Sequence, residues 1–330
     1  MNVLIADAQF EGEPDIEREV FADCATVVAS PANRLNEISD ATLARADGLI
    51  CYHHLQVTSA LLGRMPRCRY IVRAGVGFDN VDIRAAAERN IPVSNVPDYG
   101  TLEVADHSIA MTMTLLRGVS LYSRRIFEDT QGGWDYRSAP AIRRLSGTVF
   151  GALGLGRIGL AAAVKAKALG MDVLFYDPFL PTGFELSTGL RRVRALRALL
   201  EQSHVLSIFT PLTDVTRRMI DAEALKLLPK GAIVVNTARG PIVDTAALRD
   251  ALLAGHVAAA ALDVLPDEED VSSDPLIQEW RKGNPSLRDR VVVSPHAAFF
   301  SPQSLIDLRR KSAETMREYL LGNEVRDRVN

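Results

Sequence analysis

The sequence has few of the features that mark secreted, membrane or nucleic-acid-binding proteins. Its 330 residues include only three cysteines, which lie far apart at positions 24, 51 and 68. Such a set argues against a disulfide framework or a zinc site. No apolar run approaches the ~20 residues that cross a bilayer. The net charge of −3 leaves no strongly basic surface for nucleic acid. We therefore expect no metal, no membrane contact and no nucleic acid contact.

The remaining composition is that of an ordinary globular protein with a hydrophobic core. Hydrophobic residues make up 47% of the chain and charged residues 24%. The length favours two domains. The start, MNVLIAD, lacks the layout of a signal peptide and is typical of a first strand, so we expect a cytoplasmic protein.

Two stretches alternate short apolar runs with segments of helical spacing. In the first, residues 3–6, 48–51, 70–73 and 92–96 predict strands, and residues 34–46, 57–65 and 81–89 predict helices. The second begins at residue 149 and continues to the run VVVSP, before an amphipathic helix over 301–321. This alternation predicts two doubly wound parallel sheets, and hence an α/β protein.

Residues 101–128 lie between these stretches, are rich in apolar side chains and contain no proline. They predict one long helix with Thr101 as its cap. Its apolar surface is more than one domain readily covers, so we expect a homodimer formed through this helix.

A glycine turn begins the second alternation. Gly154, Gly156 and Gly159 form a G-x-G-x-x-G that follows a predicted strand and opens a predicted helix. Asp177 ends the next strand 18 residues later (177 − 159 = 18), close to the ~20-residue spacing of dinucleotide-binding domains. The glycines let the backbone approach a pyrophosphate, and the aspartate accepts hydrogen bonds from a ribose. Because its charge repels an additional phosphate, NAD is favoured over NADP.

Three charged residues follow predicted strands of the second stretch: Arg239, Glu268 and His296. The carboxyl ends of strands meet at one edge of a doubly wound sheet, so these side chains are expected to converge. A histidine exchanges a proton near neutral pH, a carboxylate orients it, and an arginine binds a carboxylate substrate. Taken singly, each residue also suits a surface ion pair, a solvated acidic loop or a helix entry.

The chain resembles the D-isomer-specific 2-hydroxyacid dehydrogenases over nearly its whole length, and is most similar to their C-terminal binding protein branch. The matching stretches are ICYHHLQVT (50–58), YIVRAGVGFDNVDI (70–83), ALGLGRIG (152–159), VLFYDPFL (173–180), VVNTARGPIVD (234–244), AALDV (260–264) and SPHAAFFS (294–301).

The resemblance implies a Rossmann NAD-binding domain (101–296) inserted into a flavodoxin-like substrate domain (1–100 and 297–330). His296 corresponds to the acid/base of the family, Glu268 to its carboxylate partner and Arg239 to its substrate arginine. The implied substrate contacts are Arg73, Val76, Gly77, His53 and Phe299. The expected cofactor contacts, glycine turn included, are Val76, Val104, Gly154, Leu155, Gly156, Arg157, Ile158, Gly159, Asp177, Thr210, Pro211, Thr237, Ala238, Arg239, Asp263, His296 and Ala298.

The sequence departs from the family pattern at three places. Glu269 follows Glu268 where a proline is common, which leaves open which glutamate faces His296; counting five residues from Asp263 (263 + 5 = 268) favours Glu268. Phe209-Thr210 stands where histidine and a small residue are usual. His204 replaces an acid at the start of a strand, which we interpret as a surface change.

These observations predict an NAD-dependent oxidoreductase that interconverts a small D-2-hydroxy acid and its 2-oxo acid. The alternative is an NAD(H)-sensing corepressor like the animal C-terminal binding proteins, because that branch keeps the same charged residues. The sequence ends at Asn330 without the long tail of those corepressors, which favours the enzyme. The sequence does not identify the hydroxy acid, the direction of the reaction or the pathway.

Overall fold

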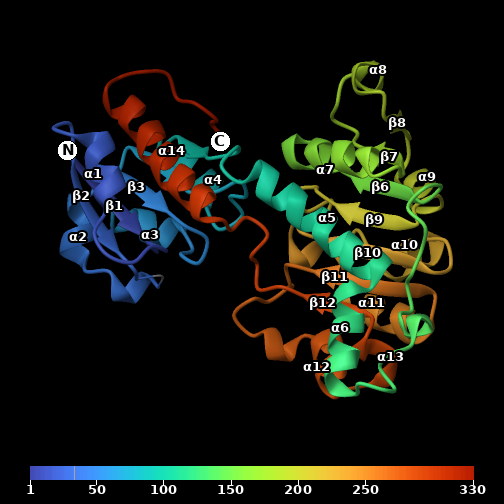
Figure 1. Cartoon of the computed structure of the whole chain (residues 1–330). Helices are drawn as coiled ribbons and strands as arrows, with labels where there is room; N and C mark the ends of the chain where they lie inside the picture. Colours follow the sequence, from blue (N-terminus) through green and yellow to red (C-terminus); the bar gives the residue numbers. More distant parts are fainter. Residues whose placement is uncertain (33) are drawn as a thin grey trace. The chain divides into compact units, whose positions relative to one another are not determined.

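The computed structural model describes residues 1–32 and 34–330, which form two compact units. The first unit comprises Met1–Gly100 and Phe300–Asn330, and the second comprises Thr101–Phe299. Each unit is a parallel β-sheet flanked by helices (Figure 1). The prediction of an α/β protein with two doubly wound sheets is confirmed.

The first unit contains five strands in the order β2-β1-β3-β4-β5, and all its pairings are parallel. This is the flavodoxin-like order, with its switch point between β1 and β3. The strands are β1 (Asn2–Ala6), β2 (Thr26–Ser30), β3 (Gly48–Cys51), β4 (Tyr70–Arg73) and β5 (Val93–Asn95). The helices are α1 (Asp15–Phe21), α2 (Asp40–Arg45), α3 (Ser59–Gly63), α4 (Ile83–Glu88) and α14 (Pro302–Leu320), with a 3₁₀ turn, η1 (Leu35–Glu37).

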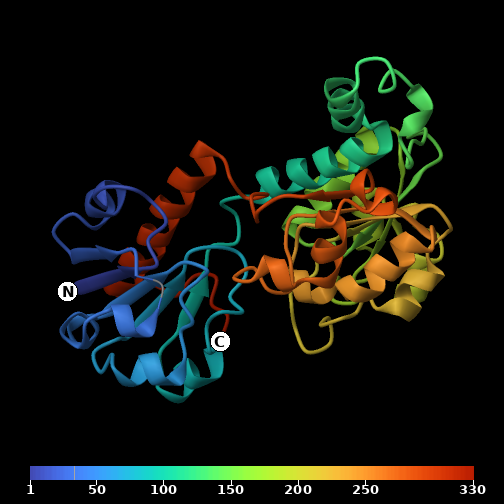
Figure 2. The ribbon, with the colours of Figure 1, turned by 90° about the horizontal axis from the view of Figure 1, so that it is seen from below.

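The last helix, α14, packs against the first sheet and against α1 (Figure 2). A Cβ atom at Gly48 of β3 would lie 2.6 Å from Met316 Sδ, so glycine allows this close approach. Arg309 of α14 forms a bidentate pair with the buried carboxylate of Glu17, at 2.9 and 2.7 Å. Paired in this way, a charge can be buried at modest cost.

The second unit contains seven strands in the order β12-β11-β10-β9-β6-β7-β8. This is the Rossmann order, and the chain reverses direction across the sheet between β6 and β9. The strands are β6 (Val149–Leu153), β7 (Asp172–Tyr176), β8 (Arg191–Arg192), β9 (Val205–Ile208), β10 (Ala232–Asn236), β11 (Val257–Leu262) and β12 (Val291–Val293).

The helices of the second unit cover both faces of its sheet. They are α5 (Thr101–Arg117), α6 (Val119–Glu128), α7 (Arg157–Ala168), α8 (Phe184–Thr188), α9 (Leu196–Leu200), α10 (Ala222–Leu227), α11 (Thr245–Leu253), α12 (Pro275–Arg281) and α13 (Pro285–Arg288). Three 3₁₀ turns join them: η2 (Tyr136–Ser138), η3 (Gly240–Ile242) and η4 (Val271–Ser273). Within the described residues, no helix is long and apolar enough to span a bilayer.

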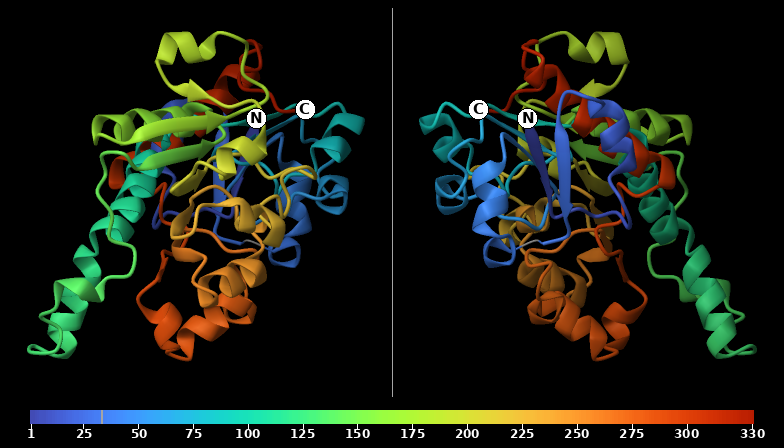
Figure 3. Two further views of the ribbon diagram at one scale, coloured as in Figure 1. Left: turned by 90° about the vertical axis from the view of Figure 1, so that its right-hand side faces the viewer. Right: turned by 90° about the vertical axis from the view of Figure 1, so that its left-hand side faces the viewer.

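The prediction of a single helix over 101–128 is wrong, because the chain breaks at Gly118. This residue has φ +64°, and a Cβ atom there would lie 2.9 Å from Ala139 Cβ. The second piece, α6, buries none of its side chains and extends beyond the sheet of its unit (Figure 3). Thr101 is the first residue of α5 rather than its cap, and its hydroxyl has no hydrogen-bond partner among the described residues.

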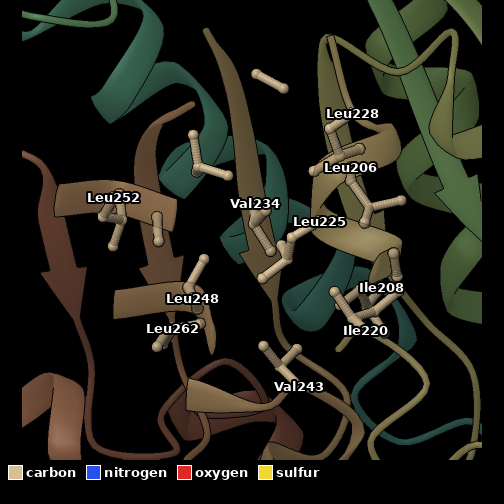
Figure 4. Packing of buried hydrophobic residues seen from close by; sticks show 14 of the residues in the cluster. Leu206, Ile208, Ile220, Leu225, Leu228, Val234, Val243, Leu248, Leu252 and Leu262 are labelled. Carbon is tan, nitrogen blue, oxygen red and sulfur yellow. The ribbon is translucent and has the colours of Figure 1, made fainter. Parts of the chain in front are cut away.

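The core of the second unit lies on both faces of its sheet. On one face, Leu206, Val234 and Leu262 from three neighbouring strands join Leu225 of α10 and Leu248 of α11 in a buried cluster (Figure 4). The other face packs against α5 and α7, whose small residues allow close approach. This two-sided burial explains why the strands are continuous apolar runs in the sequence.

His204 is not only a surface substitution, because its side chain forms a hydrogen bond to a neighbouring strand. Its Nδ1 atom accepts a hydrogen bond from the backbone N–H of Val149, at the start of β6 (3.0 Å). Burial, and then the charge of Arg143, lowers the pKa of this histidine below its usual value. Both observations favour the neutral ring, which can accept the bond.

Candidate active site

The glycine turn joins the end of β6 to the start of α7, at the switch point of the second sheet. Gly154 has φ +88°, and a Cβ atom on it would lie 3.0 Å from the backbone nitrogen of Thr210, which follows β9. A Cβ atom on Gly159 would lie 2.4 Å from the carbonyl oxygen of Gly154. At Gly156 no atom lies within 4 Å of that position. The outer glycines are therefore required by packing, whereas the middle one faces open space.

Asp177 follows β7 and is hydrogen-bonded to this turn. Its Oδ2 atom accepts from Leu155 N and its Oδ1 atom from Phe179 N, both at 2.9 Å. An ionised carboxylate has about four acceptor positions, so capacity for ribose hydroxyls is left. The half-buried Asp177 is thus fixed in direction.

These features fit a dinucleotide. The open side of Gly156 and the first amides of α7 suit a pyrophosphate. The buried hydroxyl of Thr237, just past β10, has no hydrogen-bond partner among the described residues, which leaves it available to a ligand. The other residues expected here also follow strand ends or face them: Thr210 and Pro211 come after β9, Ala238 after β10, and Val104 is buried on α5.

His296 and Glu268 form a close pair. The Nδ1 atom of His296 lies 2.7 Å from Oε2 of Glu268. Glu268, and not Glu269, therefore faces the histidine. Both side chains keep some solvent contact, with 26% and 36% of their surfaces exposed. Because Nδ1 faces Glu268, Nε2 is the ring nitrogen on the side away from the carboxylate.

The backbone of His296 is held in an unusual conformation. Its φ is +50°, in the left-handed region that non-glycine residues rarely adopt. Its N–H donates to the carbonyl oxygen of Asp263 at 2.8 Å. Such strain persists only where the surroundings impose it.

The buried carboxylate of Asp263 supplies that constraint. Its Oδ1 accepts from Ala297 N (2.9 Å) and from the Ser294 hydroxyl, and its Oδ2 accepts from Ala298 N (3.0 Å). His107 of α5 adds a contact to Ser294 Oγ at 3.0 Å. Sequence reasoning placed Asp263 among the cofactor contacts and missed this anchoring role, and it missed Ser294 and His107 entirely. A histidine within an apolar helix was the available signal for His107.

Arg239 lies beside the loop that carries Glu268. A Cβ atom on the next residue, Gly240, would lie 1.9 Å from the carbonyl carbon of Leu265, so the two segments are in backbone contact. The side chain of Asn236 donates to the carbonyl oxygen of Arg239 (2.9 Å) and fixes its backbone. Arg239, Glu268 and His296 thus follow the neighbouring strands β10, β11 and β12.

Phe299 lies next to the catalytic candidate His296. The two rings meet edge to face, with centroids 6.0 Å apart and planes at 82°. Such an arrangement is a favourable aromatic contact.

The remaining expected substrate contacts belong to the first unit. Arg73 ends β4 and is buried, with its Nη1 donating to Ala74 O at 3.0 Å. The carbonyl oxygens of Gly75 and Val76 accept from Val96 N (3.0 Å) and Asn95 Nδ2 (2.6 Å). In a trans peptide the N–H points opposite to the carbonyl. The amides of Val76 and Gly77 are therefore turned away from β5. Their N–H groups are not used in bonds to that strand, as the expected role in binding a carboxylate requires.

His53 lies in the loop after β3, at the same edge of the first sheet. Its Nδ1 atom lies 3.1 Å from Nε2 of Gln9. Its ring also contacts that of His54, with centroids 4.1 Å apart. The side chain is therefore held by neighbours within the first unit.

Comparison with known proteins finds relatives along the whole chain. Residues 109–298 match the family described as D-isomer specific 2-hydroxyacid dehydrogenase, NAD binding domain. The chain is 31% identical to C-terminal-binding protein 1 of Caenorhabditis elegans over 93% of its own length and 42% of that protein. It is also 31% identical to D-3-phosphoglycerate dehydrogenase of Methanocaldococcus jannaschii, over 100% of its own length and 59% of that protein. The chain thus spans about half the length of these two relatives.

A solved structure is similar in fold over nearly the full chain. The crystal structure of D-lactate dehydrogenase from Aquifex aeolicus complexed with NAD and lactic acid has a TM-score of 0.84 and 28% sequence identity. The match covers 98% of this chain and 96% of that one.

The glycine turn generates a test that separates packing from ligand binding. Gly159→Ala should lower the melting temperature, because its Cβ atom would collide with the Gly154 carbonyl. Gly156→Ala should leave the melting temperature unchanged and weaken NAD binding by about tenfold or more, because its methyl group would enter the space for the pyrophosphate. Differential scanning fluorimetry and calorimetric titration with NAD measure both. A Gly156→Ala protein that binds NAD as tightly as the wild type would contradict this assignment.

Proposed function

Because the chain belongs to the D-isomer-specific 2-hydroxyacid dehydrogenase family and contains its NAD-binding domain, we propose that it is an NAD-dependent oxidoreductase acting on a small D-2-hydroxy acid and its 2-oxo acid. The observation that carries this proposal is the 2.7 Å pair between His296 and Glu268. A histidine oriented by a carboxylate at the strand ends of a nucleotide domain is suited to move the proton that accompanies hydride transfer.

In the proposed reduction of the 2-oxo acid, bound NADH would supply the hydride chemistry, with the glycine turn and Asp177 holding the cofactor. His296 donates its Nε2 proton to the carbonyl oxygen, which becomes the hydroxyl of the product. Before this transfer, Glu268 would stabilise the imidazolium and hold the ring with Nδ1 facing the carboxylate. In the reverse direction the neutral His296 would accept the hydroxyl proton.

Arginines and backbone amides would bind the substrate carboxylate. We assign this role to Arg239 of the second unit, whose planar guanidinium matches a carboxylate in two hydrogen bonds. In the first unit we assign it to Arg73 and to the amides of Val76 and Gly77. We also propose a substrate domain of 1–100 and 297–330 and a nucleotide domain of 101–296, which differ from the two compact units only in the placement of residues 297–299.

Asp177 would select NAD over NADP. The carboxylate is fixed by two backbone amides and cannot swing aside without losing them. An additional phosphate on the ribose would therefore meet a like charge. Asp263 and Ala298, anchored in the loop around His296, would line the nicotinamide end of the site.

A homodimer is the assembly that we propose. The helix α6 buries no side chain, and Val119 and Phe127 are 69% and 91% exposed, followed by Trp134 at 78%. A second copy of the chain would cover this apolar surface through a two-fold axis. Light scattering at micromolar concentration should give twice the mass of one chain, and a monomer mass would exclude this assembly.

The second candidate function is that of an NAD(H)-sensing interaction protein. It is favoured by the 31% identity to C-terminal-binding protein 1 of Caenorhabditis elegans. Fold similarity does not decide between the two, because function depends on the site. Turnover that depends on His296 would establish catalysis, whichever interactions accompany it.

The acid/base pair gives a test with a matched control, because two adjacent glutamates are available. His296→Ala should lower kcat by about 100-fold or more, the usual contribution of general acid catalysis. Glu268→Gln should move the pH optimum of 2-oxo acid reduction downward, since the imidazolium loses the charge that stabilises it. Glu269→Gln should behave like the wild type. A shift produced by Glu269→Gln alone would show that the wrong glutamate has been assigned.

The substrate class is tested by kinetics with NADH, followed by nicotinamide absorbance, on glyoxylate, pyruvate, a series of four-to-six-carbon 2-oxo acids and phosphohydroxypyruvate. Phe299 offers apolar area beside His296 and no charge for a phosphate. We therefore expect unphosphorylated acids with a short apolar or thioether side chain to have the highest kcat/KM. Phe299→Ala should weaken the longer substrates selectively. A preference for phosphohydroxypyruvate would refute this pocket assignment.

A further inference from the structure

We propose that Asn80 is a positioning residue that ties Arg73 to the loop 52–55, which carries the expected substrate contact His53. One buried side-chain amide would then position the arginine that binds the substrate carboxylate and a second contact that faces the rest of the substrate. The inference rests on the proposed function, because it concerns how the substrate contacts of the first unit are held. Asn80 lies in the loop between β4 and α4 and is only 7% exposed.

The amide group of Asn80 makes contacts in two directions. Its Nδ2 donates to the carbonyl oxygens of Tyr52 and Leu55, each at 2.8 Å. Its Oδ1 accepts from Nε of Arg73 at 3.3 Å. Both amide protons and the oxygen are thus used, and a substitution by an apolar residue would leave two carbonyls and one guanidinium N–H without this partner.

The contact to Arg73 fixes the direction of its guanidinium. Nε is bound by Asn80, and Nη1 donates to Ala74 O. Nη1 also lies 1.7 Å from where a Cβ atom of Gly75 would be, so the side chain passes directly beneath that residue. Arg73 is therefore held at the base of the loop whose amides at Val76 and Gly77 are turned away from β5.

A second buried side chain, that of Asp7, holds the same loop through two of its backbone amides. Oδ2 of Asp7 accepts from the amides of His54 (2.6 Å) and Leu55 (3.1 Å). Asp7 adopts φ +57°, which glycine tolerates best among the possible replacements. Asp7→Gly removes the two hydrogen bonds to loop 52–55 and is expected to loosen that loop. Asn80→Leu removes bonds to both the loop and Arg73 and is expected to loosen both.

A variant two residues away, at Asp82, serves as the control for a role of Asn80 in stability alone. Asp82 caps α4 by accepting from Ala85 N at 2.9 Å. Asp82→Ala should lower the melting temperature without changing substrate selectivity or KM.

The experiment compares the wild type, Asn80→Leu, Asp7→Gly and Asp82→Ala as full-length proteins with NADH. Asn80→Leu should raise the KM for pyruvate and the Kd for oxamate, an unreactive 2-oxo acid analogue, by about tenfold. It should change kcat by much less, because His296 belongs to the other unit. It should also reduce the ratio of kcat/KM between a five-carbon 2-oxo acid and pyruvate. Asp7→Gly should reduce that ratio and leave the KM for pyruvate unchanged.

Hydrogen–deuterium exchange of the peptide containing residues 52–57 gives a measurement independent of turnover. Asn80→Leu and Asp7→Gly should both accelerate exchange there, and Asp82→Ala should not. If Asn80→Leu does not fold, Asn80→Asp replaces the donor by an oxygen facing two carbonyls and should reduce the selectivity ratio as Asp7→Gly does.

Three results would overturn the inference: unchanged exchange in the Asn80 variant, equal effects on kcat and KM for every substrate, or behaviour like that of Asp82→Ala. A wild-type protein that reduces no 2-oxo acid would instead refute the proposed function, and the exchange data would still decide whether Asn80 holds the loop.

Discussion

Every strand pairing in the two sheets is parallel. The arrangement of the candidate cofactor and substrate residues in each unit follows from this constraint. Parallel strands end at the same edge of a sheet, so loops that are far apart in sequence meet there. In the second sheet this edge carries Gly154, Asp177, Arg239 and His296. Their residue types differ, but each follows the last residue of its strand by only a few positions.

The loops at these edges are anchored by the same device in both units. A buried aspartate accepts hydrogen bonds from two consecutive backbone amides: Asp7 from His54 and Leu55, and Asp263 from Ala297 and Ala298. A hydrogen bond to a charged group contributes roughly 1.5–3 kcal/mol, and an unpaired buried carboxylate is far more costly. The carboxylate and the loop therefore fix one another. This explains how His296 keeps a strained backbone while its side chain stays partly exposed.

The sequence is informative where a function needs a local pattern. Strand–helix alternation, the glycine turn and the spacing from Gly159 to Asp177 predicted both sheets and the cofactor. It is less informative where tertiary packing decides. The break at Gly118 depends on Ala139 and Ile142 lying against it, and neither is near in sequence. Several short elements were missed because a few residues carry little periodicity: α1, β2, α8, β8, α10, α12 and α13. The roles of Asn80 and Asp263 depend on distant amides that no spacing reveals.

The acidic run 267–270 is both a solvated loop and the source of the carboxylate partner of His296, the two interpretations that the sequence left open. The loop is exposed, as a solvated acidic segment would be. Yet Oδ1 of Asp267 accepts from the amides of Glu269 and Asp270, each at 3.0 Å, which closes a tight turn. Within this turn, Oε1 of Glu268 lies 3.4 Å from Leu265 N, while Oε2 meets His296. Asp267 thus shapes the turn, and Glu268 is the acid of this run that is paired with the imidazole. Replacing the run by other solvated residues would keep the exposure and lose that direction.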